Sequence, residues 1–140
     1  MDSTALLIFI VGVLIVGILL VAVIMLTKKG ASPLDVDKYR LRWLAIEKQL
    51  IREEQSSAHL AVLNADKLLD QALKERGVKG ETMGERMKAA KDSWSNANGV
   101  WTAHKLRNQI AHESDVQVSY DDARRALASF KQALKDIGAI

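Results

Sequence analysis

Residues 101–113 bring together the side chains of this chain that are best suited to chemistry on a phosphate group. Arg107 carries a permanent charge and a planar array of N–H donors that matches phosphate oxygens. His112 is a histidine, the residue type that most often accepts or donates a proton in reactions near neutral pH. Asn108 can bind phosphate or orient His112 one helical turn away, and Lys105 can attract a nucleic-acid backbone. Together these residue types form a set of side chains capable of binding an anion and transferring a proton.

These side chains need a common support, and the segment is typical of one amphipathic helix. It contains no Gly or Pro, and its apolar residues recur at the spacing of a single buried stripe. The predicted buried residues are Ala103, Leu106 and Ile110. A second set falls on the opposite side of the helix: Trp101, Lys105, Asn108 and His112. Arg107 lies between the two faces. The sequence therefore predicts a helix with a core stripe and a separate polar stripe.

The order Arg107-Asn108-x-x-x-His112 resembles the Arg-x4-6-His motif of the HEPN superfamily, small helical bundles that include many metal-independent ribonucleases. The polar residue directly after the arginine also fits that family's pattern. The resemblance covers residues 60–140, including a final helix that follows the motif after a short loop. It implies an all-helical domain that dimerises so that two motifs form one site. Because many members of the superfamily lack activity, a catalytically inactive dimerisation or adaptor module is the alternative.

Cleavage of RNA without a metal can use the substrate's own 2′-hydroxyl as the nucleophile, which DNA lacks. Arg107 would then stabilise the charge that develops on the phosphate, and His112 would transfer a proton. We therefore predict Arg107, Asn108 and His112 as catalytic residues and Lys105 as a substrate-binding residue. No His and carboxylate pair has a convincing metal spacing, and nothing in the sequence calls for a cofactor.

Two further residues of the segment are predicted at an interface between copies of the chain. Trp101 is large, lies on the polar stripe and belongs to a residue type that often anchors interfaces. His104 is interpreted as a packing or interface residue. Each motif residue also has a structural interpretation. Arg107 could pair with an acid on a neighbouring helix, and His112 could be placed by the favourable interaction of a cation with a helix C-terminus.

Length and composition limit the classes of protein to which this chain can belong. A chain of 140 residues allows one modest domain and an extension, and the single Pro favours helix. The absence of cysteine excludes disulfides, thiolate metal sites and cysteine nucleophiles. The formal net charge of +3 is compatible with RNA or anionic lipid as a partner and identifies neither.

The first part of the chain is an unbroken apolar run of 22 residues, from Ala5 to Leu26. A helix of that length rises about 33 Å, enough to cross a hydrocarbon core of about 30 Å. A cleaved signal peptide is the main competitor, but it would need a basic start and a shorter apolar run. We therefore predict a retained single-pass membrane anchor.

Basic residues follow the apolar run more densely than acidic ones. They are Lys28, Lys29, Lys38, Arg40 and Arg42, against Asp35 and Asp37. Positive residues close behind a span tend to stay in the cytoplasm. The sequence therefore predicts an N-terminus outside the cell membrane and a cytoplasmic soluble domain. Contact of these basic residues with anionic headgroups is a further alternative.

The domain organisation follows from breaks in the pattern. Residues 1–27 form the anchor, residues 28–57 a juxtamembrane linker and stalk helix, and residues 58–140 the HEPN-like domain. Residues 30–33 are interpreted as a hinge in which Ser32 caps the next helix. A break is expected at residues 53–57. The part before it is either a stalk or an additional bundle helix, and a scaffold protein built on this long helix is a third alternative.

Local signals delimit the remaining helices. Gly77 ends the helix that starts at residue 58, and Thr82 with Glu85 forms a capping box that opens a short helix. The asparagines of residues 93–99 can cap the motif helix, and Ser119 begins the last helix. The predicted fold class is all-α: one N-terminal transmembrane helix followed by an antiparallel bundle of four to five helices.

Overall fold

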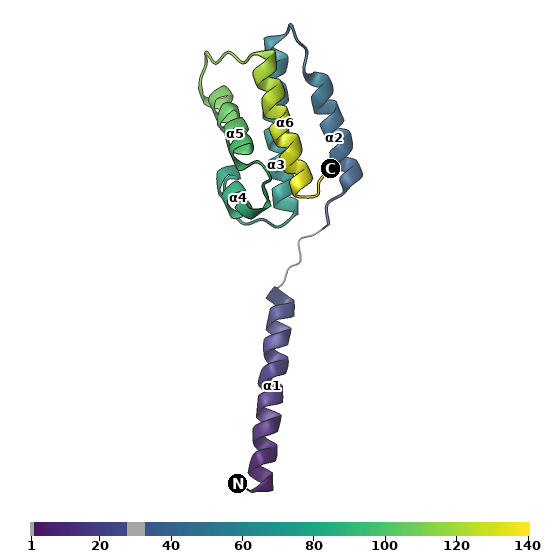
Figure 1. The fold of residues 1–140 in the computed structure, drawn as a ribbon, viewed down its shortest axis with the longest axis vertical. Helices are drawn as coiled ribbons and strands as arrows, with labels where there is room; N and C mark the ends of the chain where they lie inside the picture. Colours follow the sequence, from purple (N-terminus) through teal and green to yellow (C-terminus); the bar gives the residue numbers. More distant parts are fainter. Residues whose placement is uncertain (1, 28–32) are drawn as a thin grey trace. The chain divides into compact units, whose positions relative to one another are not determined.

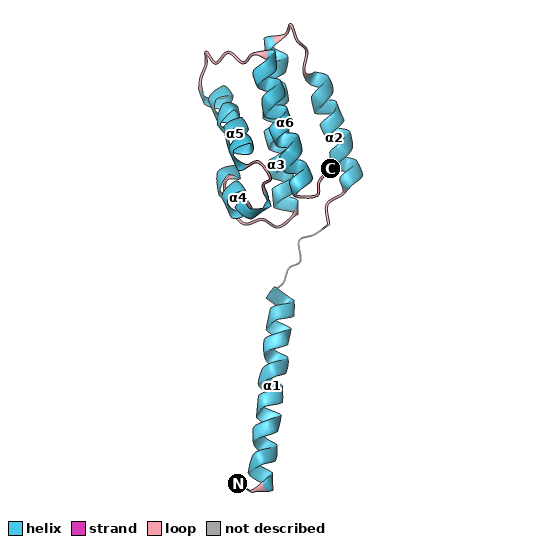
Figure 2. Cartoon of the chain, in the orientation of Figure 1, coloured by secondary structure: helices cyan, strands magenta, loops and turns pink. Residues whose placement is uncertain are grey.

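The computed structural model describes residues 2–27 and 33–140. These residues belong to two compact units, divided between positions 32 and 33. All regular secondary structure in the described residues is helical (Figure 2). The predicted all-α class is therefore confirmed. The hinge before Pro33, the Ser32 cap and the basic pair Lys28 and Lys29 lie outside the described residues.

The first unit contains the apolar helix α1 (Ser3–Thr27). Over Ser3–Leu26 it is long and apolar enough to cross a membrane, and no other helix of the described residues is. Its side chains are exposed throughout that stretch, including large ones such as Phe9 and Leu14. Soluble helices bury such surface against a core, so α1 needs an apolar environment that its own unit does not supply.

The second unit is a bundle of the remaining helices. In chain order they are α2 (Val36–Gln49), α3 (Gln55–Glu75), α4 (Met83–Ala89), a 3-10 turn (Lys91–Ser93), α5 (Ala97–His112) and α6 (Tyr120–Asp136). Helix α3 packs against α2, α4, α5 and α6 and so forms the centre of the bundle (Figure 1). Its buried face is rich in alanine, which lets neighbouring helices approach closely. The largest fully buried side chains include Phe130, Leu69 and Tyr39.

Helix α2 is a bundle helix and not a stalk. Tyr39, Trp43 and Ile46 recur at the spacing of one helical face, and all three are buried. The compact unit therefore includes residues 33–57, which were predicted to form a linker and stalk. Helix α2 begins at Val36, because Asp35 is its N-cap and accepts a hydrogen bond from the Lys38 amide at 3.1 Å.

Most of the predicted helix ends are confirmed, because they depend on contacts within a few residues. The break before α3 spans residues 50–54, three residues earlier than predicted, so α3 begins at Gln55 and not at residue 58. Gly77, with φ +79°, lies just beyond the end of α3 as expected. Thr82 and Glu85 form the expected capping box of α4. Asn96 caps α5 by accepting from the Gly99 amide at 2.9 Å. Helix α5, which carries Arg107 and His112, thus begins at Ala97, four residues before the segment 101–113 that holds the candidate catalytic residues.

Candidate functional site

The predicted core stripe of helix α5 does pack against the bundle, but the most deeply buried side is shifted from it. Its buried residues are Val100, Ala103 and His104, whereas Leu106 and Ile110 are only partly buried. The buried stripe is therefore rotated toward His104. The physical reason lies on α3, where a buried carboxylate binds the polar side chains on this side of α5. The outer face of α5 agrees better with the prediction, since Trp101, Lys105 and His112 are all exposed.

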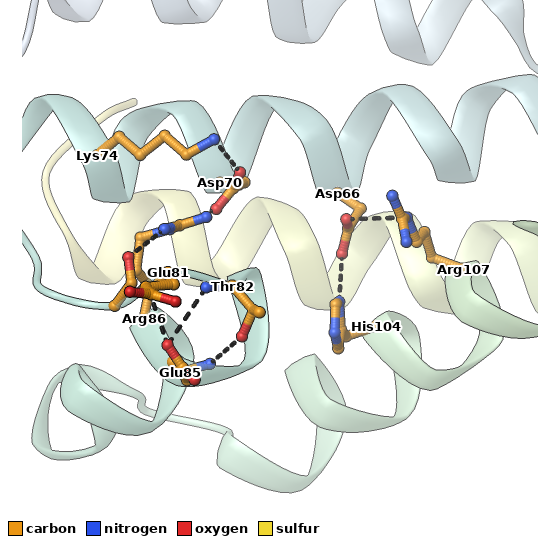
Figure 3. A network of polar contacts seen from close by, with 10 residues as sticks. Asp66, Asp70, Lys74, Glu81, Thr82, Glu85, Arg86, His104 and Arg107 are labelled. Carbon is orange, nitrogen blue, oxygen red and sulfur yellow. Dashed lines mark hydrogen bonds and ion pairs between the residues drawn. The ribbon is translucent and has the colours of Figure 1, made fainter.

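Asp66 of α3 is the centre of this contact. Its side chain is 3% exposed, and each of its two oxygens meets a different residue of α5 (Figure 3). Oδ1 lies 2.7 Å from Nδ1 of His104, and Oδ2 lies 3.2 Å from Nε of Arg107. Nε of Arg107 is buried without a well-aligned hydrogen bond, so its contact with Asp66 is an ion pair. Arg107 therefore pairs with an acid on a neighbouring helix, as its structural interpretation anticipated.

Asn108 completes the arrangement. Nη1 of Arg107 donates a hydrogen bond to Oδ1 of Asn108 at 2.9 Å. Nδ2 of Asn108 lies 3.3 Å from Nε2 of His104. Asp66, His104, Arg107 and Asn108 thus form a closed set of polar contacts between α3 and α5, which we call the Asp66 cluster. Two predicted catalytic residues belong to it.

His104 occupies a packing position and not an exposed one. It is 8% exposed, and the edge of its ring meets the Trp101 ring at an interplanar angle of 79° and a centroid distance of 6.1 Å. Trp101 itself is 39% exposed. The two predicted interface residues therefore have different surroundings. Trp101 stays available to a partner, whereas His104 is buried in the bundle and contacts Asp66.

A shallow hollow opens beside the Asp66 cluster. It is lined by Trp101, Thr102, His104, Lys105 and Asn108. A second, longer groove runs between α5 and α6 and shares Thr102 and Lys105 with the hollow. Lys105 is exposed, as predicted for a substrate-binding residue. A ligand that occupied both depressions would therefore cross the Lys105 side chain.

His112 is the predicted site residue that the structure does not bring to the cluster. It is the last residue of α5 and is exposed. No hydrogen bond joins it to Arg107 or Asn108 in the described residues, because the Asn108 amide is engaged by Arg107 and His104. His112 is five positions after Arg107 along the helix, which places the two residues about 140° apart around the axis. A shared site needs a second element or a second copy of the chain.

Asp66 was not among the residues predicted from the sequence, although a signal was present. It is four residues after Val62 and three before Leu69, and both of these apolar residues are buried in α3. An aspartate at the spacing of a core stripe must find donors, since an unpaired buried carboxylate is strongly unfavourable. That signal identifies a buried polar contact but does not reveal its partners.

A second carboxylate of α3 forms its own cluster one turn later (Figure 3). Asp70 Oδ1 lies 2.7 Å from Nε of Arg86, and Oδ2 lies 2.7 Å from Nζ of Lys74. Nη1 of Arg86 also donates to the Gly80 carbonyl at 2.5 Å. Burial raises the pKa of Asp70, but the hydrogen bonds from Arg86 and Lys74 outweigh it and hold that pKa below its ordinary value. We call these contacts the Asp70 cluster.

In the described residues, no group of three or more His, Cys, Asp or Glu side chains is arranged to hold a metal ion. Comparison with protein-family models, with characterised proteins and with solved structures finds no match to this chain. A function therefore has to be inferred from the residues of the site.

Proposed function

We propose that this chain is a membrane-anchored, HEPN-like endoribonuclease that works without a metal and acts as a homodimer. The observation that carries the proposal is the hydrogen-bonded pair of Arg107 and Asn108, of which Asn108 lines an open hollow. Both are held by the Asp66 cluster, yet the Arg107 side chain remains 35% exposed. Donors that are fixed before the substrate arrives stabilise developing charge better than donors that must first reorganise.

The proposed reaction is an internal displacement in RNA. The 2′-oxygen forms a bond to phosphorus while the bond from phosphorus to the 5′-oxygen breaks, which leaves a cyclic phosphate and a free 5′-hydroxyl. One His112 accepts the 2′-hydroxyl proton, and His112 of the second copy donates a proton to the leaving 5′-oxygen. Arg107 stabilises the charge on the non-bridging phosphate oxygens. The reaction needs a general base and a general acid at the same time, and the two copies of His112 supply one each.

Lys105 supports the assignment of RNA as the substrate. It lines both the hollow beside the Asp66 cluster and the groove between α5 and α6. A cation in that place can hold the backbone of a single strand on either side of the scissile phosphate. We therefore infer that Lys105 contributes to binding and not to the chemical step.

The homodimer is inferred from the exposed part of α5. Trp101, Lys105 and His112 are exposed along one face, and a large exposed Trp is a frequent interface anchor. A two-fold contact repeats the same patch on both partners, which would bring two motif helices together. Light scattering of residues 33–140, the compact unit, should report a dimer that Trp101→Ala weakens. A monomer at every concentration contradicts the shared site.

A cleavage assay tests the ribonuclease directly. Residues 33–140 should cut mixed RNA in the presence of a chelator and leave a cyclic phosphate or its opened product. Arg107→Lys keeps the charge but loses the forked donor array, and His112→Ala loses the proton-transfer group. Each should reduce kcat by about 10²–10³-fold. Arg40→Ala is a matched control, since Arg40 is exposed on α2. The ribonuclease proposal fails if the wild-type protein cleaves no RNA.

The membrane topology is the second part of the proposal. An apolar helix with uncovered side chains and a basic segment behind it favour a span with the bundle in the cytoplasm. A reporter fused after Ile140 of the full chain should behave as cytoplasmic. If protease added outside intact cells cleaves the reporter, the proposed orientation is wrong.

An inactive dimerisation or adaptor module is the second candidate, and one observation favours it. Arg107 and Asn108 are bonded within the fold, while His112 lies apart from them. In that case Trp101→Ala should still weaken the dimer, whereas the wild-type protein should show no cleavage. The light-scattering and cleavage assays together therefore separate the two candidates.

A further inference from the structure

We propose that Asp66 and His104 are positioning residues for Arg107 and Asn108, with His104 neutral and its proton on Nδ1. This role concerns the same site as the proposed ribonuclease, and its kinetic test rests on that proposed function. Its geometric basis, however, is independent of RNA. Each contact in the Asp66 cluster restricts which atoms carry hydrogen, and one arrangement satisfies all of them.

The first restriction comes from Arg107, whose guanidinium has donors and no acceptor. Its Nη1 lies 2.9 Å from one terminal atom of the Asn108 amide, which must therefore be the oxygen. The amide NH2 group of Asn108 then points to Nε2 of His104, 3.3 Å away. Because the amide nitrogen only donates, Nε2 has to offer a lone pair.

The second restriction comes from Asp66. An ionised carboxylate only accepts, so the atom of His104 at 2.7 Å from Oδ1, Nδ1, carries the proton. A doubly protonated His104 would place an N–H group against the Asn108 amide hydrogens. Asp66 and His104 are 2% and 8% exposed, so water has little access to relieve such a conflict. The neutral ring with hydrogen on Nδ1 is therefore the form that fits. It leaves the negative charge of Asp66 to pair with Arg107.

This arrangement has a consequence for catalysis. Arg107 has a long side chain that would otherwise lose much rotamer freedom when it binds a phosphate. Asp66 holds its Nε edge, and Asn108, itself held by His104, holds Nη1. Nη2 has no hydrogen bond within the described residues and remains for a ligand. Asp66 and His104 therefore act through Arg107 and need not touch RNA.

Three substitutions test the positioning role. Asp66→Asn keeps an acceptor for His104 but removes the ion pair with Arg107, so kcat should fall by about 10-fold to 100-fold. His104→Leu replaces the ring by an apolar side chain of comparable bulk. It removes the acceptor for the Asn108 amide and should cause a similar loss of kcat. His104→Gln restores a donor and an acceptor, and should recover most of the activity. A role in packing alone would not produce this rescue.

Asp70→Asn is the matched control, because it makes the same chemical change one turn away on α3. It should lower the melting temperature and leave kcat of the folded protein unchanged. If Asp66→Asn and His104→Leu turn over RNA at the wild-type rate, the positioning role is overturned. A loss of kcat in Asp70→Asn equal to that in Asp66→Asn also overturns it, since the effect would then be general.

A spectroscopic readout separates this inference from the ribonuclease proposal. Nitrogen-15 NMR of the histidine rings in residues 33–140 should show Nδ1 of His104 protonated and Nε2 unprotonated at neutral pH. The opposite tautomer or a doubly protonated ring overturns the assignment. If the wild-type protein cleaves no RNA, the proposed function and the kinetic role fall together, while this spectrum still decides the proton arrangement.

Discussion

Asp66 and Asp70 lie one turn apart on α3, and each binds an arginine and one further basic side chain (Figure 3). Their partners come from different places. Asp70 binds Lys74 of its own helix and Arg86 of α4, which follows directly along the chain. Asp66 binds two residues of α5, which is distant in sequence. The same residue type on one helix thus supports two different elements of the bundle.

The exposure of the two arginines distinguishes the clusters further. The Arg86 side chain is 6% exposed and also binds the Gly80 carbonyl, so its donors are used inside the fold. The Arg107 side chain is 35% exposed, and Asn108, to which it donates a hydrogen bond, lines a hollow. A buried carboxylate–guanidinium pair therefore has a structural role at Asp70. At Asp66 the same pair leaves part of the guanidinium available to a ligand.

The largest effect on stability is expected from Arg86→Ala. Removing this guanidinium leaves the Asp70 carboxylate with Lys74 alone and the Gly80 carbonyl without its donor. Loss of one partner from a fully buried pair costs about 3–5 kcal/mol in the free energy of unfolding, and this pair, with Asp70 18% exposed, should lie at the lower end of that range. Urea denaturation of residues 33–140 would measure it. A loss below about 1 kcal/mol would show that the Asp70 cluster contributes little to the fold.

Arg107→Ala should affect catalysis more than stability. Under the proposed ribonuclease function, the rate of RNA cleavage should fall by about 10²–10³-fold, because the substitution would remove charge stabilisation in the transition state. The unfolding free energy should fall by about 1–3 kcal/mol, because the Arg107 side chain is 35% exposed, so its removal lets water reach Asp66, which also keeps its hydrogen bond from His104. Cleavage rates and urea curves for Arg86→Ala and Arg107→Ala, compared in parallel, check both statements. Equal losses of stability would remove the distinction between the clusters.

Acid should weaken the Asp70 cluster. The pKa of Asp70 in the folded protein is lowered, whereas the unfolded chain has the ordinary value of about 3.9. The stability from this group is therefore present above about pH 4 and is lost as the pH falls through the folded pKa. Urea midpoints measured from neutral to acidic pH should decrease more steeply for the wild-type protein than for Arg86→Ala. If the urea midpoints of the two proteins decrease equally with pH, Asp70 is not the source of the acid sensitivity.

The smallest effect is expected from Thr82→Ala. The Thr82 hydroxyl accepts a hydrogen bond from the Glu85 amide at 3.2 Å and so caps α4, the helix that carries Arg86. Loss of such a cap costs about 1 kcal/mol. Thermal melts of residues 33–140 should show the decrease, with RNA cleavage unchanged at low temperature. A drop in cleavage without a drop in melting temperature would connect α4 to the site instead.

Several features of this protein could be predicted from the sequence because they depend on residues close together in the chain. The apolar helix α1 follows from composition alone, since every side of it is apolar. The caps at Thr82, Asn96 and Ser119 each join atoms three residues apart. The exposure of Trp101 and Lys105 also followed from helical periodicity. Local hydrogen bonds and a fixed helical repeat suffice for all of these.

Other features were decided only when distant elements packed together. Helix α2 could have been a stalk, and burial of Tyr39 and Trp43 against the bundle places it in the core. The rotation of α5 depends on Asp66, which is 38 residues before His104 in the chain. Periodicity measures the apolar side of a helix but not the partner that a buried carboxylate will find. For that reason the sequence indicated the motif residues, while the tertiary structure decided that Arg107 and Asn108 are held together and that His112 is not.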